Sequence, residues 1–315
     1  MATKTENGLC AWSHSRANVM ATCQRQFYFS YCAPAAWDHP DPVMRDLYLL
    51  KQVKPIAMWK GDVVHQAIAE FFRALLNGQV QTCDVVLQSA EQLARVQWAF
   101  SLNGRYRSQG RRRAGSAFAA LFEHEYQIED AESLDQAIEH IRQCLVNFFE
   151  IDRTERISDT FRAGRSHLVE PPAWGLDATN FEIPGISVTV KVDLAFGTEA
   201  KEYHIFDWKT GKASEDYGPQ LELYSLWAHQ SLGHDLASIT AHEVSLPNLT
   251  CSSHRLTEQG KFYRLATIRR SAQLIDALTC SADCSTGPQL RDFNYARYLG
   301  TCQRCSLQRV CQELR

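Results

Sequence analysis

The strongest constraint on the fold lies between residues 187 and 209, where two segments show the alternation of apolar and polar residues that is typical of β-strands. Ser187–Phe196 is the first expected strand and Tyr203–Lys209 is the second, with residues 197–202 as a hairpin connection. The elements expected after them are a helix at 218–232, a strand at 239–246 and a helix at 257–278 with Thr257 as its N-cap. Strands and helices in this order predict a small α/β sheet in the second half of the chain.

The first half of the chain has the periodicity of helices instead. Apolar residues fall near one helical face in residues 9–32 and again in Trp59–Leu76, where Asn77-Gly78 ends the expected helix. Two or three further helices are expected in residues 83–155, interrupted by an arginine-rich stretch. The sequence therefore predicts a helical part followed by an α/β part, and it contains no internal repeat.

The net charge of the sequence limits how the protein can bind a polyanion such as DNA or RNA. The net charge of −3 argues against a uniformly basic nucleic-acid binder, so contact with DNA or RNA must come from a local basic patch. Between two expected helices, nine residues without an acid contain five arginines: Arg105, Arg107, Arg111, Arg112 and Arg113. This run is either a solvated surface or, with Gly104 and Gly110 making it mobile, a loop that follows a phosphate backbone.

The cysteine content and the apolar runs suggest where the protein works. The N-terminus is polar and lacks the apolar core of a signal peptide, and no apolar run is long enough to cross a bilayer. These features predict a cytoplasmic protein with no membrane partner. Eleven cysteines are many for a reducing compartment, so we expect some of them to bind metal and the rest to be buried thiols.

The segment Phe206-Asp207-Trp208-Lys209-Thr210-Gly211 carries the first chemical signal. In a strand, Asp207 and Lys209 point to one face and Trp208 to the other. Asp193, at the expected end of the preceding strand, brings a second carboxylate to the same place. Oxygen ligands of this kind suit an octahedral Mg²⁺ or Mn²⁺, although Asp-x-Lys on its own is more often a surface ion pair.

Three more residues belong to the same constellation. Gln220 and Tyr224 lie four apart on one face of the next expected helix, where they reach toward a phosphate or a metal-bound water. Their alternative interpretation is a partly exposed glutamine and a buried tyrosine. His65, four residues after Gly61, is either a core histidine or a metal ligand that favours Mn²⁺ over Mg²⁺.

The ordered set Gly61-x-x-x-His65, Asp193, Asp207-x-Lys209 and Gln220-x-x-x-Tyr224 resembles the RecB-like branch of the PD-(D/E)XK nucleases, which includes AddB and the CRISPR-associated RecB-like exonucleases. The resemblance implies that His65, Asp193, Asp207 and the main-chain carbonyl of Trp208 bind metal. It assigns to Lys209 the orientation of the attacking water, and it places Gln220 and Tyr224 in the helical motif that follows. Asp207 departs mildly from the motif of that family, in which glutamate is common at this position. The likeness extends from about residue 60 to residue 228, and residues 83–155 match no family that we can name.

The cysteines near the C-terminal end carry the second chemical signal. Cys302, Cys305 and Cys311 form a C-x2-C-x5-C motif, but a metal centre of thiolates needs a fourth ligand. The same resemblance supplies Cys23, in a serine-led helix that ends in Cys-x-Arg-x-Phe-Tyr, and it implies a 4Fe–4S cluster on these four cysteines. The rival interpretation is a zinc site formed by four thiolates: Cys280, Cys284, Cys302 and Cys305.

Together these features predict an α/β protein with a restriction-endonuclease-like core sheet flanked by helices, and an iron–sulfur clasp that joins the termini. The expected parts are an N-terminal segment with the first cluster cysteine (1–58), a first core helix (59–82), a helical insertion (83–165), the nuclease core (166–280) and a C-terminal cluster segment (281–315). The expected function is metal-dependent hydrolysis of DNA, at single strands or ends, in repair, recombination or anti-phage defence. The alternatives are a nuclease-fold subunit within a larger complex and a non-catalytic nucleic-acid-binding scaffold.

Overall fold

The computed structural model describes residues 5, 8–171, 179–211, 218–279 and 287–314. The chain forms two compact units. Unit 1 comprises Met1–Val53, Asn180–Val190 and Phe262–Arg315, and unit 2 comprises Lys54–Thr179 and Lys191–Lys261. Both units therefore combine segments that lie far apart in the sequence. Within the described ranges, no helix is long and apolar enough to cross a bilayer.

A mixed five-stranded sheet forms the centre of unit 2. Its order is β2 (Arg165–Val169), β5 (Leu194–Gly197), β6 (Tyr203–Lys209), β7 (Ile239–Ser245) and β8 (Thr250–His254). Strands β6 and β7 are parallel, whereas β5 is antiparallel to β2 and β6, and β8 is antiparallel to β7. The helix α10 (Gly218–Leu232) connects the two parallel strands, as parallel pairing requires. The carboxyl ends of β6 and β7 consequently lie side by side.

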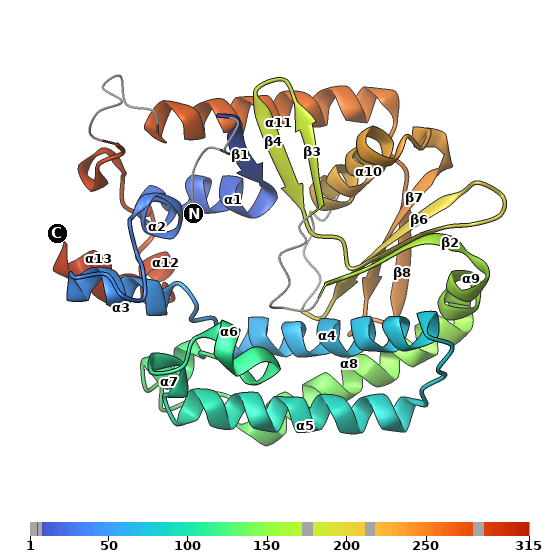
Figure 1. Cartoon of the computed structure of the whole chain (residues 1–315), viewed down its shortest axis with the longest axis horizontal. Coiled ribbons are helices and arrows are strands. Elements are labelled where there is room, and N and C mark those ends of the chain that lie inside the picture. Colours follow the sequence, from blue (N-terminus) through green and yellow to red (C-terminus); the bar gives the residue numbers. More distant parts are fainter. Residues whose placement is uncertain (1–4, 6–7, 172–178, 212–217, 280–286, 315) are drawn as a thin grey trace. The chain divides into compact units, whose positions relative to one another are not determined.

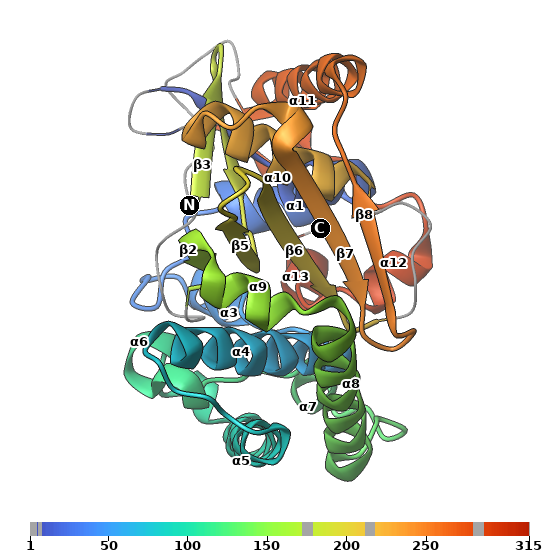
Figure 2. The same ribbon diagram turned by 90° about the vertical axis from the view of Figure 1, so that its right-hand side faces the viewer.

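Helices cover both faces of this sheet (Figures 1 and 2). On one face lie α4 (Ile56–Leu76), α8 (Leu134–Glu155) and α9 (Ile157–Ala163), and on the other lies α10. The ring of Trp208 in β6 packs between Phe72 of α4 and Phe148 of α8, at centroid distances of 6.2 and 5.5 Å. Because side chains alternate along a strand, Asp207 and Lys209 point to the opposite face, toward α10.

The expected helical insertion is helical. It contains α5 (Cys83–Leu102), α6 (Arg111–Ala114), α7 (Phe122–Glu125), α8 and α9, with 3₁₀ turns at Arg105–Arg107 and Gly115–Ala117. The long helices α5 and α8 pack with α4 around a shared apolar core that also takes in Trp208. Serine and glutamine at the N-terminus of α8 form a reciprocal capping box, Ser133 with Gln136, which fixes where that helix begins.

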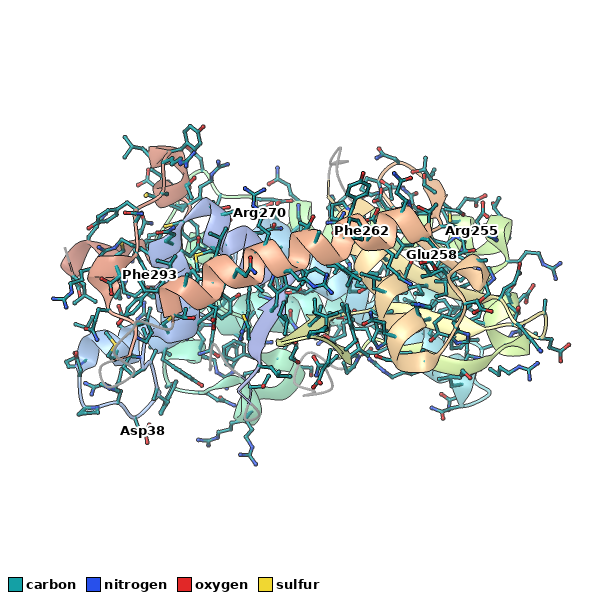
Figure 3. All side chains as sticks on the ribbon, turned by 90° about the horizontal axis from the view of Figure 1, so that it is seen from above. Asp38, Arg255, Glu258, Phe262, Arg270 and Phe293 are labelled. Atoms are coloured by element: carbon teal, nitrogen blue, oxygen red, sulfur yellow. The ribbon has the colours of Figure 1, made fainter. Side chains whose placement is uncertain are left out.

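Unit 1 contains a three-stranded sheet and a set of mostly short helices. The sheet order is β1 (Cys10–Ser13), β4 (Ile186–Val190) and β3 (Thr179–Ile183). The helices are α1 (His14–Thr22), α2 (Gln24–Phe27), α3 (Pro42–Leu50), most of α11 (Glu258–Thr279), α12 (Leu299–Gln303) and α13 (Gln308–Glu313), with a π-helix at Tyr28–Cys32 and a 3₁₀ turn at Leu290–Asp292. Trp12 donates a hydrogen bond from Nε1 to Ser271 Oγ of α11, at 2.8 Å. The outer side of α11 is exposed, as at Phe262 and Arg270 (Figure 3).

Two of the sequence predictions for these elements need correction. The single strand expected at Ser187–Phe196 is two strands, because the chain leaves the sheet of unit 1 after Val190 and enters the sheet of unit 2 at Leu194. The helical segment expected at residues 9–32 begins with β1, which pairs with β4. By contrast, Thr257 caps α11 as predicted, since its hydroxyl accepts a hydrogen bond from the Gly260 amide at 3.0 Å.

Candidate functional site

One hollow of unit 2, about 390 Å³ in volume, is lined by every residue that the sequence analysis placed in the carboxylate–lysine site. These residues are His65, Asp193, Asp207, Trp208, Lys209, Gln220 and Tyr224. They come from α4, from the start of β5, from the end of β6 and from α10. The hollow is therefore formed where two antiparallel strands and two helices meet, one helix from each side of the sheet.

Pairing between β5 and β6 brings the two predicted aspartates together. Asp193 lies directly before β5 and not at the end of a strand as expected, but β5 runs antiparallel to β6, so its start adjoins the end of β6. The Trp208 amide donates a hydrogen bond to Asp193 Oδ2 at 2.9 Å. Asp193 and Asp207 are 5% and 2% exposed, so both carboxylates have lost most of their contact with water.

His65 reaches this pair from α4. Its Nε2 lies 2.9 Å from the Trp208 carbonyl oxygen, and its Nδ1 lies 3.3 Å from Asp193 Oδ1. One turn earlier, a Cβ added to Gly61 would come within 2.9 Å of Thr210 Oγ1. Glycine at this position lets α4 approach the end of β6, which explains why the motif joins Gly61 to His65.

Glu170 also lines the hollow, and sequence reasoning missed it. It directly follows β2, whose Val169 pairs with Leu194 of β5, and its amide donates to the Asp193 carbonyl oxygen at 2.7 Å. Its Oε2 lies 3.5 Å from His65 Nδ1. Each of these three residues, His65, Glu170 and Asp193, offers one possible metal-ligand atom, and the three atoms lie within 4.8 Å of one another. An acid at the end of a strand, just before Pro171, was the only signal in the sequence.

On the α10 side, a chain of hydrogen bonds holds Lys209 and Asp207. Lys209 forms a short ion pair with Asp207 and donates from Nζ to Gln220 Oε1 at 2.9 Å. Gln220 Nε2 donates to the Tyr224 hydroxyl at 2.5 Å, and that hydroxyl donates to Asp207 Oδ1 at 3.0 Å. The helical motif thus positions both the carboxylate and the ammonium.

The charges in the hollow shift one another's protonation. Burial and the charge of Asp193 raise the pKa of Asp207 to about 6, against the opposing effect of Lys209. Burial lowers the pKa of His65, but the Asp193 and Glu170 carboxylates outweigh it and hold that pKa well above its usual value. Burial raises the pKa of Glu170, but His65 and Lys191 outweigh it and bring the pKa to about 2. The site is a buried cluster of carboxylates that favours positive charge.

The buried carboxylate oxygens test whether a metal ion fits here. Glu170 Oε2 accepts no hydrogen bond from the described residues and lies 3.5 Å from His65 Nδ1, whereas Asp207 Oδ2 forms an ion pair with Lys209. A buried carboxylate oxygen without a hydrogen bond is costly unless a cation lies close to it. Carboxylates, an imidazole and a main-chain carbonyl form a donor set that Mg²⁺ and Mn²⁺ accept. The residues present therefore fit a divalent ion.

A model of the PD-(D/E)XK nuclease superfamily matches residues 11–312 of the sequence, nearly the whole chain. The chain belongs to this superfamily. Membership indicates a phosphodiester nuclease that binds nucleic acid and works with a divalent metal ion. The mixed α/β architecture of this PD-(D/E)XK protein agrees with that family.

Comparison with individual proteins adds little to the family match. No curated protein sequence matches this PD-(D/E)XK protein. A solved structure, titled "Crystal structure of SSO0001", is similar with 14% sequence identity and a TM-score of 0.27, over 60% of this chain and 78% of its own. A likeness of that size carries no argument about fold or function.

The predicted arginine patch of this PD-(D/E)XK protein divides into two groups. Arg107 forms a short ion pair with the buried carboxylate of Glu125, which also accepts the Tyr106 hydroxyl. Arg112 and Arg113 are exposed on α6, and Arg111 lies over the ring of Phe118 at 4.8 Å. Arg111 and Asp62 of α4 line one small cavity, and Asp62 also lines the carboxylate hollow. The helix α6 therefore lies beside the part of α4 that borders the site.

Unit 1 brings the four predicted cluster cysteines to a single cavity of about 50 Å³. Cys23 follows α1, Cys302 and Cys311 lie in α12 and α13, and Cys305 lies between those two helices. Burial raises the pKa of Cys305 to about 11, with smaller contributions from Cys23, Cys311 and Cys302. The rival zinc ligands Cys280 and Cys284 lie outside the described residues.

Proposed function

We propose that this PD-(D/E)XK protein is a Mg²⁺- or Mn²⁺-dependent deoxyribonuclease of the RecB-like branch that acts on single strands or ends. The observation that supports this most is the pairing of a buried carboxylate cluster with the Lys209 ammonium in one hollow. Three buried carboxylates, those of Glu170, Asp193 and Asp207, line that hollow together with His65. A core serving stability alone would not retain such charges in this arrangement.

His65, Glu170, Asp193, Asp207 and the Trp208 carbonyl would hold the ion. When bound, a divalent ion supplies an activated water and neutralises charge on the phosphate oxygens. His65 favours Mn²⁺, because imidazole is a softer ligand than the oxygens that Mg²⁺ prefers. The hydrogen bond from Trp208 to Asp193 fixes the direction of that carboxylate, so the protein itself arranges the oxygens.

Lys209 would act on the reacting phosphate. Its ammonium lies between Asp207 and Gln220 in the lining of the hollow, at the end of a flexible side chain. There it would orient the attacking water and stabilise the negative charge that develops as the water adds to phosphorus. Gln220 and Tyr224 hydrogen-bond to Lys209 and Asp207, and so keep both groups in place.

DNA would be held in part by α6. Arg111, Arg112 and Arg113 present cationic groups beside the site-bearing part of α4, and guanidinium groups bind phosphates without reading sequence. Arg105, on the preceding 3₁₀ turn, is exposed and lies 5.3 Å from the ring centre of Phe100, whose ring contacts that of Phe118 beneath Arg111. Arg107 is excluded from this role because it neutralises Glu125.

Cys23, Cys302, Cys305 and Cys311 would bind a 4Fe–4S cluster that joins the two ends of the chain within unit 1. Support comes from their common cavity and from their spacing. Purified without oxygen, the protein should be brown and hold about four irons per chain.

The biological role would be DNA processing in repair, recombination or anti-phage defence, alone or with partner proteins. A nuclease-fold subunit whose specificity comes from a partner is the second candidate. A scaffold without activity is disfavoured, because the full set of carboxylates and the lysine is present in one hollow.

The test is digestion of end-labelled single- and double-stranded DNA, with matching RNA, under anaerobic conditions. We expect cleavage of single-stranded DNA or of ends with Mn²⁺ or Mg²⁺, and none with a chelator. Metal-dependent cleavage of RNA alone would overturn the choice of substrate. Equal cleavage with and without the chelator would overturn the metal-dependent mechanism.

A further inference from the structure

Two polar side chains of α8 hydrogen-bond to the main chain around the site lysine, one to Thr210 after β6 and one to Leu246 after the neighbouring strand β7. No residue of α8 lines the hollow itself. The two side chains are those of His140 and Asn147, which lie seven residues apart and hence on nearly the same face of the helix. This helix lies in the helical segment 83–165, which supplies none of the residues that line the hollow. The two contacts connect that segment to the site.

His140 holds the residue after Lys209. Its Nε2 lies 3.0 Å from the Thr210 carbonyl oxygen, and burial lowers the pKa of His140, so the ring is neutral at neutral pH and donates from Nε2. Thr210 is confined from the other side by Gly61 of α4, as described above. The end of β6 therefore lies between two helices, and each restricts it.

Asn147 holds the neighbouring strand at the same level. Its Nδ2 donates to the Leu246 carbonyl oxygen at 2.8 Å, and the Leu246 amide donates to the Lys209 carbonyl oxygen at 2.9 Å. Gln143 orients the Asn147 amide by donating to Oδ1 at 2.8 Å. Asn147 is buried, so these bonds are shielded from water and from exchange with it.

Both side chains act at a place where small displacements matter. The chain between Trp208 and Thr210 carries the Lys209 ammonium and the carbonyl oxygen that lies beside His65. The Trp208 ring is fixed in the aromatic core by Phe148, a neighbour of Asn147 on α8. Displacing a reacting group by about 1 Å lowers a rate by about a hundredfold.

We propose that His140 and Asn147 are positioning residues, through which the helical segment holds the Lys209 backbone in the geometry that cleavage requires. This inference rests on the proposed nuclease function of the Lys209 site. It predicts that removing either hydrogen bond lowers kcat, leaves KM unchanged, and loosens the end of β6.

The experiment compares His140→Ala, His140→Gln and Asn147→Ala with the parent protein. In cleavage of end-labelled single-stranded DNA, the two alanine variants should lose about tenfold to a hundredfold in kcat with unchanged KM. His140→Gln should recover most of that loss, because its amide nitrogen reaches as far as the imidazole Nε2 and also donates. Hydrogen exchange should accelerate in peptides covering residues 205–211 and at Leu246 in the alanine variants, and return toward the parent rate in His140→Gln.

The matched control is His124→Ala in the same helical segment. Burial also lowers the pKa of His124, but its ring contacts Ser101, at 3.0 Å, and no part of β6. This variant should keep the parent kcat and the parent exchange rate at residues 205–211. Parent-like kcat and exchange in both alanine variants would overturn the inference. If the parent cleaves nothing, the proposed function fails, and the exchange rates alone then decide the inference.

Discussion

The two chemically distinctive regions of this molecule are built in different ways. The carboxylate hollow of unit 2 is held by a central sheet and long helices, and its polar groups already bond to one another: Asp193 to Trp208, and Lys209 to Gln220. The cysteine cavity of unit 1 is held by helices of four to nine residues and by the loops between them. Distant segments meet there through single contacts, as where Arg309 of α13 pairs with Asp46 of α3 and where Arg25 donates to the Leu314 carbonyl oxygen at 3.1 Å. On the proposed function, we therefore expect the first site to form without its metal and the second to depend on its cluster.

The largest expected effect is on the stability of unit 1. Cys302→Ser should remove the brown colour and destabilise the protein by more than about 4 kcal/mol, the range associated with loss of a bound metal. Chemical unfolding followed by visible absorbance and circular dichroism measures both. The control is Cys251→Ser, which changes a half-buried thiol of β8 outside the cavity and should keep the colour. A colourless Cys302→Ser variant with the stability of the parent would break the comparison, because unit 1 would then not depend on its cluster.

The next effect is on the chemistry of unit 2. Lys209→Ala should slow cleavage by about a hundredfold to a thousandfold, about 2.7–4 kcal/mol of barrier, because a charge facing the reacting phosphate is removed. The iron content should stay that of the parent. The melting temperature should fall without a divalent ion, because the buried Asp207 carboxylate loses its cation, and should return toward that of the parent with Mn²⁺. Single-turnover cleavage and thermal melts with and without Mn²⁺ measure these effects. Fast cleavage by the variant would remove Lys209 from the mechanism, and a large loss of stability in the presence of Mn²⁺ would show that the hollow is not preformed.

A smaller effect is the pH dependence of stability. We expect it in unit 2 because two histidines of its sheet lie in contact. His204 Nδ1 lies 2.9 Å from His242 Nε2, and burial, followed by the charges of His204 and Arg255, lowers the pKa of His242 to about 4. The unfolded chain therefore binds a proton near pH 6.5, before the folded protein does. The free energy of unfolding is therefore unaffected by protonation of His242 above pH 6.5. As the pH falls from 6.5 toward 4, protonation of the unfolded chain lowers it by about 1–3 kcal/mol.

Urea unfolding of the parent and of His242→Phe at pH 7.5 and pH 5 measures this contribution. The parent should lose more stability than the variant between the two values, since the variant lacks the titrating ring. Equal losses in both proteins would mean that the histidine pair does not titrate as its burial implies.

The smallest effect is on substrate binding. Replacing Arg111, Arg112 and Arg113 by alanine should weaken binding of all DNA sequences alike. The slope of the logarithm of the binding constant against the logarithm of salt concentration should become shallower by about 0.7 for each phosphate of single-stranded DNA that the arginines no longer neutralise. Affinity measured across a salt series tests this, with unchanged Mn²⁺ binding expected. Arg107→Ala is the contrasting control, because it leaves the buried Glu125 without its cation and should cost stability instead. Identical salt dependence in the triple variant and the parent would show that α6 does not hold the substrate.

Sequence patterns predicted the parts of the fold that depend on neighbours in the chain. Strand β6, the hairpin before it, α10 and the cap at Thr257 follow from local alternation, helical spacing and capping chemistry. The break between β4 and β5 could not be seen, because Val190 and Leu194 keep the same alternation while joining different sheets. Periodicity reports which side of a strand is buried and not which sheet buries it.

The residues whose surroundings the sequence did not reveal depend on interactions between distant segments. Glu170 lies in the site because β2 pairs with β5, and the residues next to Glu170 in the sequence do not predict that pairing. Arg107 appeared to belong to the substrate-binding arginines, but Glu125, eighteen residues later, takes its charge. His65 and Asp193 were foreseen because a family motif already encodes their distant contact.

The central claim is that the hollow of unit 2 holds a divalent ion on a preformed set of ligands. Calorimetric titration of Mn²⁺ into the parent and into Asp193→Asn tests this most directly. The asparagine keeps an oxygen for the Trp208 amide and removes only the charge. We expect the parent to bind Mn²⁺ and the variant to bind it at least about tenfold more weakly, with an unchanged melting temperature. Identical titrations of the two proteins would contradict the claim.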